Sequence, residues 1–458
     1  MVSFILPGNS ASGEYEVANS CRFNNDDNAE LSKTPGSDGN RRKWTFSCWV
    51  KRSQISSTHE YLLSAEGETT VYFRGELLQT ELYDGNNYYI RTNRVFRDPS
   101  AWYHIVCVWD TENSTEANRL RLYVNGVEET SFSASAYPTQ NYDSYMNKSG
   151  NAIRIGSYVN DNDGKNFDGY MAEAVLVDGQ ALTPTSFGEF DEDTNIWKPI
   201  DVSGLTFGTN GFYLDFEDSS NLGNDVNGGT DFTVTNLTAI DQATDTCTNN
   251  FATMNPLDFH NNAPTLSNGN LTVAAASSNS PIRATMGFSK GKWYAEYRFE
   301  ASDNDNHVGC HSLETSLTTN YTGGETYSWG FLTSSGNKRN GGVSTSYGSA
   351  VGYSNPIIMI AIDKDNGKIW WGVNGTWVAS GDPANGSNEA YSNINTVVGS
   401  DGFVTFSDTT YRNGSWNFGN PIHSISSGNS DANGYGNFEY AVPSGFYSLC
   451  TKNLADYG

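Results

Sequence analysis

A short acidic run, Glu189-Phe190-Asp191-Glu192-Asp193, is the first place where residue types and spacing could support catalysis. Glycosidases use two carboxylates, one as nucleophile and one as acid/base, and a strand with acids at alternate positions presents them on one face. The run follows Pro184, precedes Pro199 and lacks flanking β-branched residues, so a strand is not favoured there. We therefore interpret it as a solvated acidic loop and expect no enzymatic activity.

A second acidic stretch, Asn160–Gly169, places Asp161, Asp163 and Asp168 in one loop. Calcium takes six to eight oxygen ligands in flexible geometry, so these three carboxylates are candidate calcium ligands. The alternative is a pair of β-turns built on Asp-Gly. The sequence leaves both interpretations open, and no other cofactor is indicated.

Tyrosines in polar loops are the candidate ligand-binding residues. Sugars stack on flat aromatic rings and hydrogen-bond to neighbouring Asn and Asp, and similar loops also suit protein contacts. The alternative is that these rings anchor their loops to the body of the domain. The candidates are Tyr88, Tyr89, Tyr142, Tyr145 and Tyr435.

His307 and His311 flank Cys310 in a segment with strand character. Alternate residues of a strand share a face, so the two histidines would point away from the cysteine and the three could not chelate a metal together. We expect an ordinary sheet surface there. No nucleophile elbow, phosphate loop or histidine-based triad spacing is present.

The stretch Trp102–Val127 indicates the kind of scaffold that must position these residues. Its first run is apolar on both alternating faces, which predicts a strand covered on both sides. Its second run ends at Asn125-Gly126, a dipeptide that accepts positive φ at both central positions of a type I′ turn. A return strand is therefore expected from Val127.

A similar pattern recurs in Ile357–Trp377, where an apolar strand, an Asn/Asp-rich loop and a second strand lead to Asn374-Gly375. Two such hairpins in different halves predict two antiparallel β-sandwiches in tandem. No segment has an apolar period of 3.6 residues with caps, so we expect an all-β chain with very little helix.

The domain boundaries follow from the polar stretch between the two sets of strands. We predict a first sandwich over residues 1–243, a linker over 244–250 and a second sandwich over 251–458. The six cysteines are scattered and none forms a CxxC motif, so we expect reduced thiols.

Composition limits the classes of partner. The chain has 458 residues and a formal net charge of −25. Nucleic-acid binding needs Lys and Arg to replace counterions, so it is not expected. No window resembles a membrane span, and the N-terminus lacks the basic region of a signal peptide, so membrane insertion and secretion are not expected either.

Several motifs carry a resemblance to known domains. The first half resembles the laminin-G-like, concanavalin-A-like jelly roll, and the second half looks like a SPRY domain. The matching pieces in the first half are Lys43–Val50, Trp102–His104, Leu122–Gly126 and Ile155-Gly156. Those in the second half are Gly291–Glu296, Val308-Gly309, Ile360–Asp363, Trp370–Gly375, Asn417–Gly419 and Pro443–Phe446. The second half departs from the SPRY pattern at Asn355-Pro356, where Gly-Asp is usual.

The joined pair is similar to large virion proteins of marine tailed phages, and this resemblance implies several expectations. The chain would be a non-enzymatic virion surface protein, tail-fibre-like or capsid-associated, made in the host cytoplasm. It would bind other virion proteins and a host-surface glycan or protein in host attachment, as a homo-oligomer. Laminin-G-like domains often hold calcium at the rim, which agrees with the Asn160–Gly169 interpretation. The alternatives are a glycan-degrading depolymerase of the concanavalin-A-like glucanase type and a purely structural decoration protein.

Overall fold

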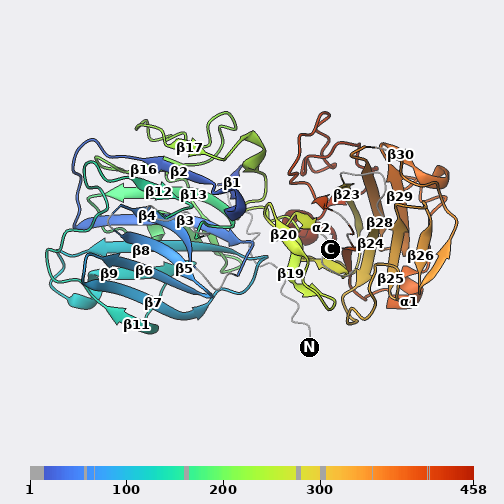
Figure 1. Cartoon of the computed structure of the whole chain (residues 1–458), viewed down its shortest axis with the longest axis horizontal. Helices are drawn as coiled ribbons and strands as arrows, with labels where there is room; N and C mark the ends of the chain where they lie inside the picture. The colour runs from blue at the N-terminus through green and yellow to red at the C-terminus, as the bar shows by residue number, and fades with distance from the viewer. Residues whose placement is uncertain are drawn as a thin grey trace. The chain divides into compact units, whose positions relative to one another are not determined.

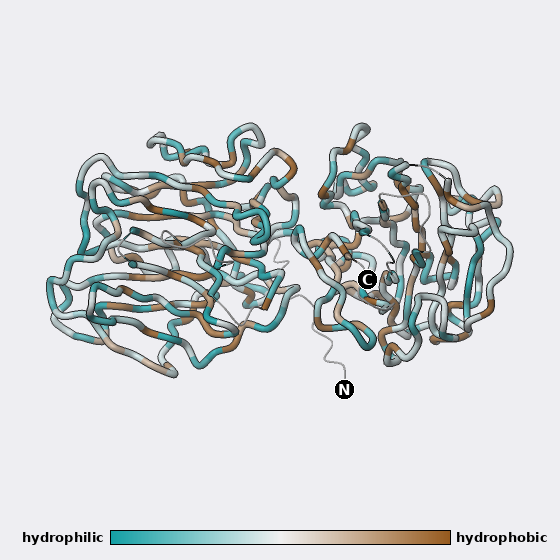
Figure 2. The backbone as a smooth tube through the Cα atoms, viewed as in Figure 1, coloured by the Kyte–Doolittle hydropathy of each residue, from teal (hydrophilic) through white to brown (hydrophobic). Residues whose placement is uncertain are grey.

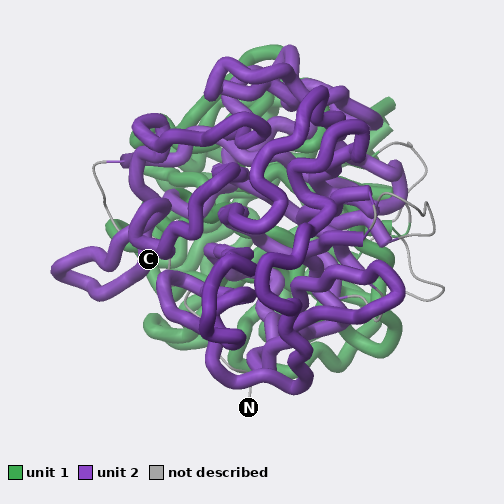
Figure 3. Tube along the Cα trace, turned by 90° about the vertical axis from the view of Figure 1, so that its left-hand side faces the viewer, with its two compact units in different colours: residues 1–10, 249–458 green, residues 11–248 purple. Residues whose placement is uncertain are grey.

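The computed structural model describes residues 15–55, 59–66, 68–158, 165–274, 280–299, 306–352, 354–409, 411 and 413–458. The chain divides into two compact units, one ending at Thr248 and the other beginning at Asn249 (Figure 3). We call them the N-terminal unit and the C-terminal unit. Strands make up 41% and helices 6% of the structure, so the chain is nearly all-β, as predicted.

The N-terminal unit is a sandwich of two antiparallel sheets (Figure 1). The first sheet runs in the order β10 (Val127–Glu128), β9 (Leu120–Val124), β8 (Trp102–Asp110), β3 (Lys43–Arg52), β13 (Gly169–Asp178), β1 (Ser20–Phe23) and β18 (Gln242–Ala243), with β16 (Phe212–Leu214) also paired to β13. The second runs in the order β11 (Phe132–Ala136), β7 (Asn87–Val95), β6 (Leu77–Tyr83), β5 (Thr69–Arg74), β4 (His59–Ala65), β12 (Ile153–Ile155), β2 (Glu30–Lys33) and β17 (Thr233–Thr235). A separate hairpin joins β14 (Gly188–Phe190) to β15 (Trp197–Pro199).

Strand β8 shows why the sequence folds this way. Ile105 and Cys107 point into the core between the two sheets. Val106 and Val108 point to the opposite face, where a second apolar cluster covers them. The prediction of a strand buried on both faces is therefore confirmed, because the long connection after β13 packs over the outside of the first sheet.

The C-terminal unit is also built from two antiparallel sheets. One runs in the order β19 (Met254–Phe259), β22 (Ile282–Ala284), β31 (Val404–Thr409), β24 (His307–Ser312), β25 (Ser328–Leu332), β26 (Lys338–Asn340) and β27 (Val343–Thr345). The other runs in the order β20 (Thr265–Ser267), β21 (Thr272–Ala274), β32 (Gly414–Asn417), β23 (Lys292–Phe299), β28 (Ile357–Asp363), β29 (Lys368–Val373) and β30 (Thr376–Trp377), with β33 (Tyr447–Ser448) parallel to β23. Figure 2 shows hydrophobic residues within the strands of both units and polar residues at many of the turns.

Within the described part of the chain, helical structure is confined to short pieces. The α-helices are α1 (Ile394–Val398) and α2 (Thr451–Tyr457). The 3₁₀ turns are η1 (Asn25–Asp27), η2 (Glu116–Asn118), η3 (Pro184–Ser186), η4 (Ala239–Asp241) and η5 (Val378–Ser380). No helix in the described residues is long and apolar enough to cross a membrane.

Both Asn-Gly dipeptides form the predicted hairpin tips. Asn125 and Gly126 have φ of +48° and +78°, and Asn374 and Gly375 have φ of +47° and +83°. Positive φ at both central residues defines a type I′ turn, whose twist matches that of the flanking strands. Strands β10 and β30 begin directly after these turns, so both predicted return strands are present.

The two ends of each unit lie together. In the N-terminal unit, β1 pairs with β18, and the Val17 amide donates to the Thr248 hydroxyl over 3.2 Å. In the C-terminal unit, Phe251 forms a β-bridge with Cys450. Most of residues 244–250, the predicted linker, are buried, and Asp245 is fully buried against Lys51.

Candidate functional site

The β14–β15 hairpin carries a hollow of about 470 Å³ on the N-terminal unit. Its lining combines five carboxylates and one lysine with aromatic and aliphatic side chains. The lining residues are Tyr15, Glu189, Phe190, Asp191, Glu192, Asp193, Lys198, Pro199, Ile200 and Asp201. The acidic run singled out from the sequence therefore forms much of this hollow, in company with residues that the sequence did not indicate.

Trp197 fixes the hairpin to the sheet beneath it. Its indole nitrogen lies 2.9 Å from Nδ1 of His104 in β8, and the two rings stack with centroids 5.8 Å apart. The ring also covers Gly126 so closely that a Cβ there would collide with it. The predicted hairpin tip at Asn125-Gly126 is thus part of the platform that supports the hollow.

His104 and Ser47 resemble a catalytic dyad, but the hydrogen bond between them runs in the wrong direction for catalysis. Nε2 of His104 lies 2.8 Å from the Ser47 hydroxyl. An indole N–H can only donate, so Trp197 makes Nδ1 the acceptor and leaves the ring hydrogen on Nε2. His104 therefore donates to Ser47 and cannot remove its proton. Burial also lowers the pKa of His104 to about 3, which keeps the ring neutral.

The acids of the hairpin do not form the alternating pair that a glycosidase of this type would need. Glu189 lies in β14, whereas Asp191 and Asp193 lie in the connecting turn. Asp191 Oδ1 accepts from the Thr194 amide and hydroxyl at 2.9 and 2.8 Å, and these hydrogen bonds are the main reason that its pKa is lowered to about 2. Asp191 is thus an ionised hydrogen-bond acceptor rather than a general acid.

One lining residue of the hollow, Tyr15, is linked to a buried acid. The Tyr15 hydroxyl lies 3.0 Å from Oε2 of Glu173 in β13. The Tyr213 hydroxyl lies 2.8 Å from the same oxygen. Burial is the main cause that raises the pKa of Glu173 to about 7. Sequence reasoning missed this group, since Tyr15 and Glu173 are far apart in the chain and neither belongs to a motif.

The tyrosines proposed from the sequence are half-buried rather than fully exposed. Tyr88 and Tyr142 meet edge to face with centroids 5.0 Å apart, and both pack against the core, as does Tyr145. Tyr89 lies beside Arg91, with the guanidinium 5.7 Å from the ring centroid. Tyr435 belongs to the C-terminal unit, where the Lys452 ammonium lies 5.4 Å from its ring centroid. None of the five lines the hollow.

The predicted calcium ligands can be followed in part. Asp161 and Asp163 lie outside the described residues. Asp168 is 5% exposed, and its Oδ1 has no hydrogen-bond partner. Burial, with smaller contributions from Glu60 and Asp26, raises the pKa of Asp168 to about 8. Among the described residues, no group of three or more His, Cys, Asp or Glu is arranged to hold a metal ion.

A second unpartnered oxygen lies across from Asp168. Strands β1 and β13 pair Phe23 with Gly169. Asn24 directly follows β1 and Asp168 directly precedes β13, so the two residues come next along the antiparallel pair. Asn24 is 8% exposed, and its Oδ1 also lacks a partner. Opposite residues of an antiparallel pair have Cβ atoms about 5 Å apart and share a face. Two unpaired oxygens on one face fit part of a calcium shell. Asp168 is one of the three predicted calcium ligands, whereas Asn24 was not indicated by the sequence.

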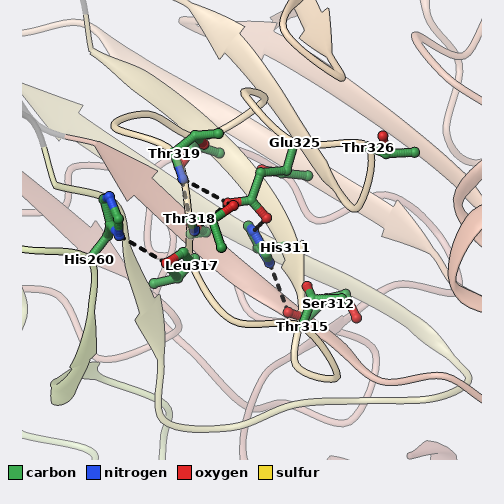
Figure 4. Close-up of polar contacts among 12 residues, drawn as sticks. His260, His311, Ser312, Thr315, Leu317, Thr318, Thr319, Glu325 and Thr326 are labelled. Carbon is green, nitrogen blue, oxygen red and sulfur yellow. Dashed lines mark hydrogen bonds and ion pairs between the residues drawn. The ribbon is translucent and has the colours of Figure 1, made fainter.

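His311 and Glu325 form a buried polar cluster in the C-terminal unit (Figure 4). Nδ1 of His311 lies 2.8 Å from the Ser312 carbonyl oxygen, and Nε2 lies 3.2 Å from Glu325 Oε2. The other carboxylate oxygen accepts from the Thr318 and Thr319 amides. Burial opposes ionisation of Glu325, but these bonds outweigh it and lower the pKa to about 2. The cluster holds the loop between β24 and β25. This loop covers His311, so the prediction of an ordinary sheet surface at this position is wrong.

Comparison with known families finds a match within the first domain. Residues 23–186 match a family described as the concanavalin A-like lectin/glucanases superfamily. No curated protein matches the chain. The predicted fold class, all-β with a concanavalin-A-like first domain, is confirmed by this match and by the antiparallel sheets.

Three solved structures are similar to parts of the chain. The SPRY domain of human HERC1 has 13% identity and a TM-score of 0.29, over 36% of this chain and 96% of that one. A candidate carbohydrate-binding protein from Bacteroides ovatus has 16% identity and a TM-score of 0.33, over 48% and 58%. A heptameric SAP-like pentraxin from Limulus polyphemus has 16% identity and a TM-score of 0.27, over 37% and 80%.

Proposed function

We propose that this chain is a non-enzymatic surface protein of a phage virion, tail-fibre-like or capsid-associated, and that its N-terminal unit binds a glycan in the hollow at β14–β15. The observation that carries the binding proposal is the hollow itself, on a unit whose residues 23–186 match a lectin and glucanase family. The virion assignment rests on the resemblance of the joined modules to tailed-phage virion proteins.

The lining of the hollow has the chemistry that a sugar requires. Phe190 is 43% exposed, and its ring meets Trp197 edge to face, so it can offer one flat face to a pyranose. Ionised carboxylates accept hydrogen bonds from sugar hydroxyls, and charge-assisted bonds of this kind are stronger than neutral ones. Lys198 reaches both Glu189 and Asp191 at 3.3 Å, which orients the acceptors before a ligand arrives.

The proposed partners follow from this placement on a virion surface. They are a glycan or protein of the host surface and other virion proteins, with the chain present as a homo-oligomer because virions repeat parts by symmetry. The proposed role is host attachment.

We also propose a bound calcium ion beside Asn24 and Asp168, at the end of the β1–β13 pair. The support is the pair of buried oxygens without partners, since a buried polar atom left unpaired is costly. A cation would satisfy both oxygens and would hold β1 against β13.

Binding can be tested by calorimetric titration of the purified chain with fragments of host polysaccharide. Phe190→Ala and Glu189→Gln should each weaken binding about tenfold or more, because they remove a stacking face and an acceptor. Tyr83→Ala is the matched control, since Tyr83 is 47% exposed on the same unit and does not line the hollow. Equal losses in all three variants would contradict a site at the hollow.

The same preparation separates the rival functions. Release of reducing sugar by the wild type, abolished in Glu189→Gln, would identify a depolymerase. Absence of both sugar binding and cell binding would leave the purely structural decoration protein.

A further inference from the structure

His311 of β24 lies between two groups that accept hydrogen bonds (Figure 4). Its Nδ1 lies 2.8 Å from the Ser312 carbonyl oxygen, and its Nε2 lies 3.2 Å from Oε2 of Glu325. A neutral imidazole has one N–H and one bare nitrogen, so it can donate to only one of these acceptors. The imidazolium, with a hydrogen on each nitrogen, can donate to both.

Glu325 is the carboxylate of this pair rather than a protonated acid. Its Oε1 accepts from the Thr318 amide, the Thr318 hydroxyl and the Thr319 amide, at 2.5, 2.9 and 2.9 Å. Burial opposes ionisation of Glu325, but these bonds and the one from His311 outweigh it and lower its pKa to about 2. Oε2 is therefore an acceptor, and the hydrogen that it accepts must come from Nε2 of His311.

Arg283 of β22 lies beside His311 but does not neutralise Glu325. Its guanidinium donates to the Ser312 carbonyl oxygen over 2.6 Å, so it shares that acceptor with His311. Its charge is balanced by Asp258 of β19, whose carboxylate lies 2.7 Å from it. Glu325 therefore depends on His311 for its counter-charge.

The other elements packed around His311 contribute side chains that do not compete for its hydrogens. The residues opposite it on the neighbouring strands are Ser328 in β25 and Thr405 in β31, and neither titrates. Two titratable groups of the same region, Glu314 and His260, each bond to a backbone group. The pairing with Glu325 is thus the interaction that responds to the charge of the ring.

Glu325 fastens one segment of the loop between β24 and β25. Within the described residues, the Thr318 and Thr319 amides donate to its Oε1 and to no other acceptor. The following part of the loop has its own anchor, because the Thr322 amide donates to the Thr409 hydroxyl in β31 over 2.8 Å. A change at Glu325 therefore acts first on Thr318 and Thr319.

We propose that the His311–Glu325 pair is a pH-sensitive latch: rising pH removes one ring hydrogen from His311, and the Thr318–Thr319 segment then loosens. The neutral ring makes at most one of its two hydrogen bonds, whichever nitrogen keeps the hydrogen. It also leaves Glu325, whose side chain is 10% exposed, without a counter-charge, and a buried charge in this state is costly. Movement of the segment lets water reach the carboxylate. The latch does not depend on glycan binding.

The state of the ring is measured by NMR of the full chain with ¹⁵N-labelled histidine. The two ring nitrogens of an imidazolium have similar chemical shifts, whereas those of a neutral ring differ widely. The His311 signals are assigned by their absence in His311→Gln. The wild-type ring should be doubly protonated at pH 5 and neutral by pH 9. A ring that is already neutral at pH 5, or still doubly protonated at pH 9, would overturn the latch.

The loosening is measured by exchange of the Thr318 and Thr319 amides with water. The two measurements are made about one pH unit below and above the midpoint found for His311. After correction for intrinsic rates, protection of both amides should fall about tenfold. Equal protection on the two sides of the midpoint would show that the segment does not respond to the ring.

Glu325→Gln provides the test of cause, because an amide suits a neutral histidine. Its oxygen can accept from the Thr318 and Thr319 amides, and its NH₂ group can donate to a bare Nε2 of His311. The ring should then be neutral at pH 6, and protection of the two amides should no longer depend on pH. Wild-type pH dependence in this variant would mean that another group is responsible, and the proposal would be wrong.

Glu314→Gln is the matched control, since Glu314 is an exposed acid of the same loop that bonds to the Phe403 amide instead of His311. It should keep both the doubly protonated ring at pH 5 and the tenfold fall in protection. Loss of the pH dependence in this control as well would reject the assignment to Glu325.

Discussion

The indole nitrogen of Trp197 donates to Nδ1 of His104 over 2.9 Å, and this bond joins the acidic hairpin to the central sheet of the N-terminal unit. It determines which ring nitrogen of His104 carries hydrogen, and so why Ser47 is not activated. It also makes the shape of the hollow depend on one buried aromatic contact.

Trp197→Phe should therefore destabilise the N-terminal unit. The change removes the hydrogen bond, leaves a buried acceptor on His104 and opens a small cavity, at a combined cost of about 2–4 kcal/mol. Urea denaturation followed by tyrosine and tryptophan fluorescence measures the loss. A cost below about 0.5 kcal/mol would mean that the hairpin is held by other contacts.

Gly126→Ala tests the close approach of Trp197 to the hairpin tip. An alanine there is strained by φ of +78°, and its Cβ would lie 2.3 Å from the nearest atom of the Trp197 ring, so the ring must move. Gly85→Ala is the matched control, because φ is +99° and no atom lies within 4 Å of its Cβ. Strain alone should cost about 1–2 kcal/mol at Gly85, and the cost at Gly126 should exceed it by about 1–3 kcal/mol. Equal costs in thermal unfolding would contradict the packing.

Lys51→Met should be among the most damaging changes to strand β3. Lys51 and Asp245 form a salt bridge of 2.7 Å with both side chains buried, so removal of the lysine deprives a buried carboxylate of this ion pair. The expected cost is about 3–5 kcal/mol. Lys43→Met on the same strand is the control, since Lys43 is partly exposed beside Glu112, and its loss should cost at most about 1 kcal/mol.

Calcium should stabilise the N-terminal unit through Asp168. A ligand at 100 times its dissociation constant adds about 2.7 kcal/mol to the free energy of unfolding. Differential scanning calorimetry with calcium and with a chelator should show this rise in the wild type and lose it in Asp168→Asn. Asp143→Asn, which removes an exposed acid paired with Arg42, should keep the rise. If calcium does not stabilise the wild type, the proposed calcium site is wrong.

The pH dependence of stability should carry the signature of Glu173. Its pKa is raised from 4.5 in the unfolded chain to about 7 in the folded protein, so the folded state binds the proton more tightly. The resulting stability is fully present below pH 4.5 and is lost as the pH rises through 7, by about 3 kcal/mol in total. Glu173→Gln should lack this decline, and chemical unfolding at pH 4.5, 6 and 8 would show it. Parallel pH profiles for the two proteins would contradict the assignment.

Local chemistry explains what could be predicted from the sequence. The Asn125-Gly126 and Asn374-Gly375 turns follow from the φ angles that these residues tolerate, and the two-sided burial of β8 follows from its apolar alternation. Such features depend on a few consecutive residues. They were sufficient to predict two antiparallel sandwiches and very little helix.

The candidate site could not be predicted in the same way, because long-range contacts create it. Tyr15 and Glu173 meet through a bulge that no motif announces. The strands β14 and β15 have three residues each, too few to show an alternating apolar pattern. Their position on the sheet depends on the hydrogen bond from Trp197 to His104. Composition alone also could not show that Asp245, within the predicted linker over residues 244–250, pairs with Lys51 of β3.

The meeting of the two ends within each unit has a consequence for how such a chain is assembled over evolution. Because Phe251 bridges Cys450, and β1 pairs with β18, each unit enters and leaves its fold at nearly one point. A gene segment for such a unit can be spliced into a surface turn of another protein without stretching the recipient backbone. Each unit can in this sense be exchanged as a whole by recombination.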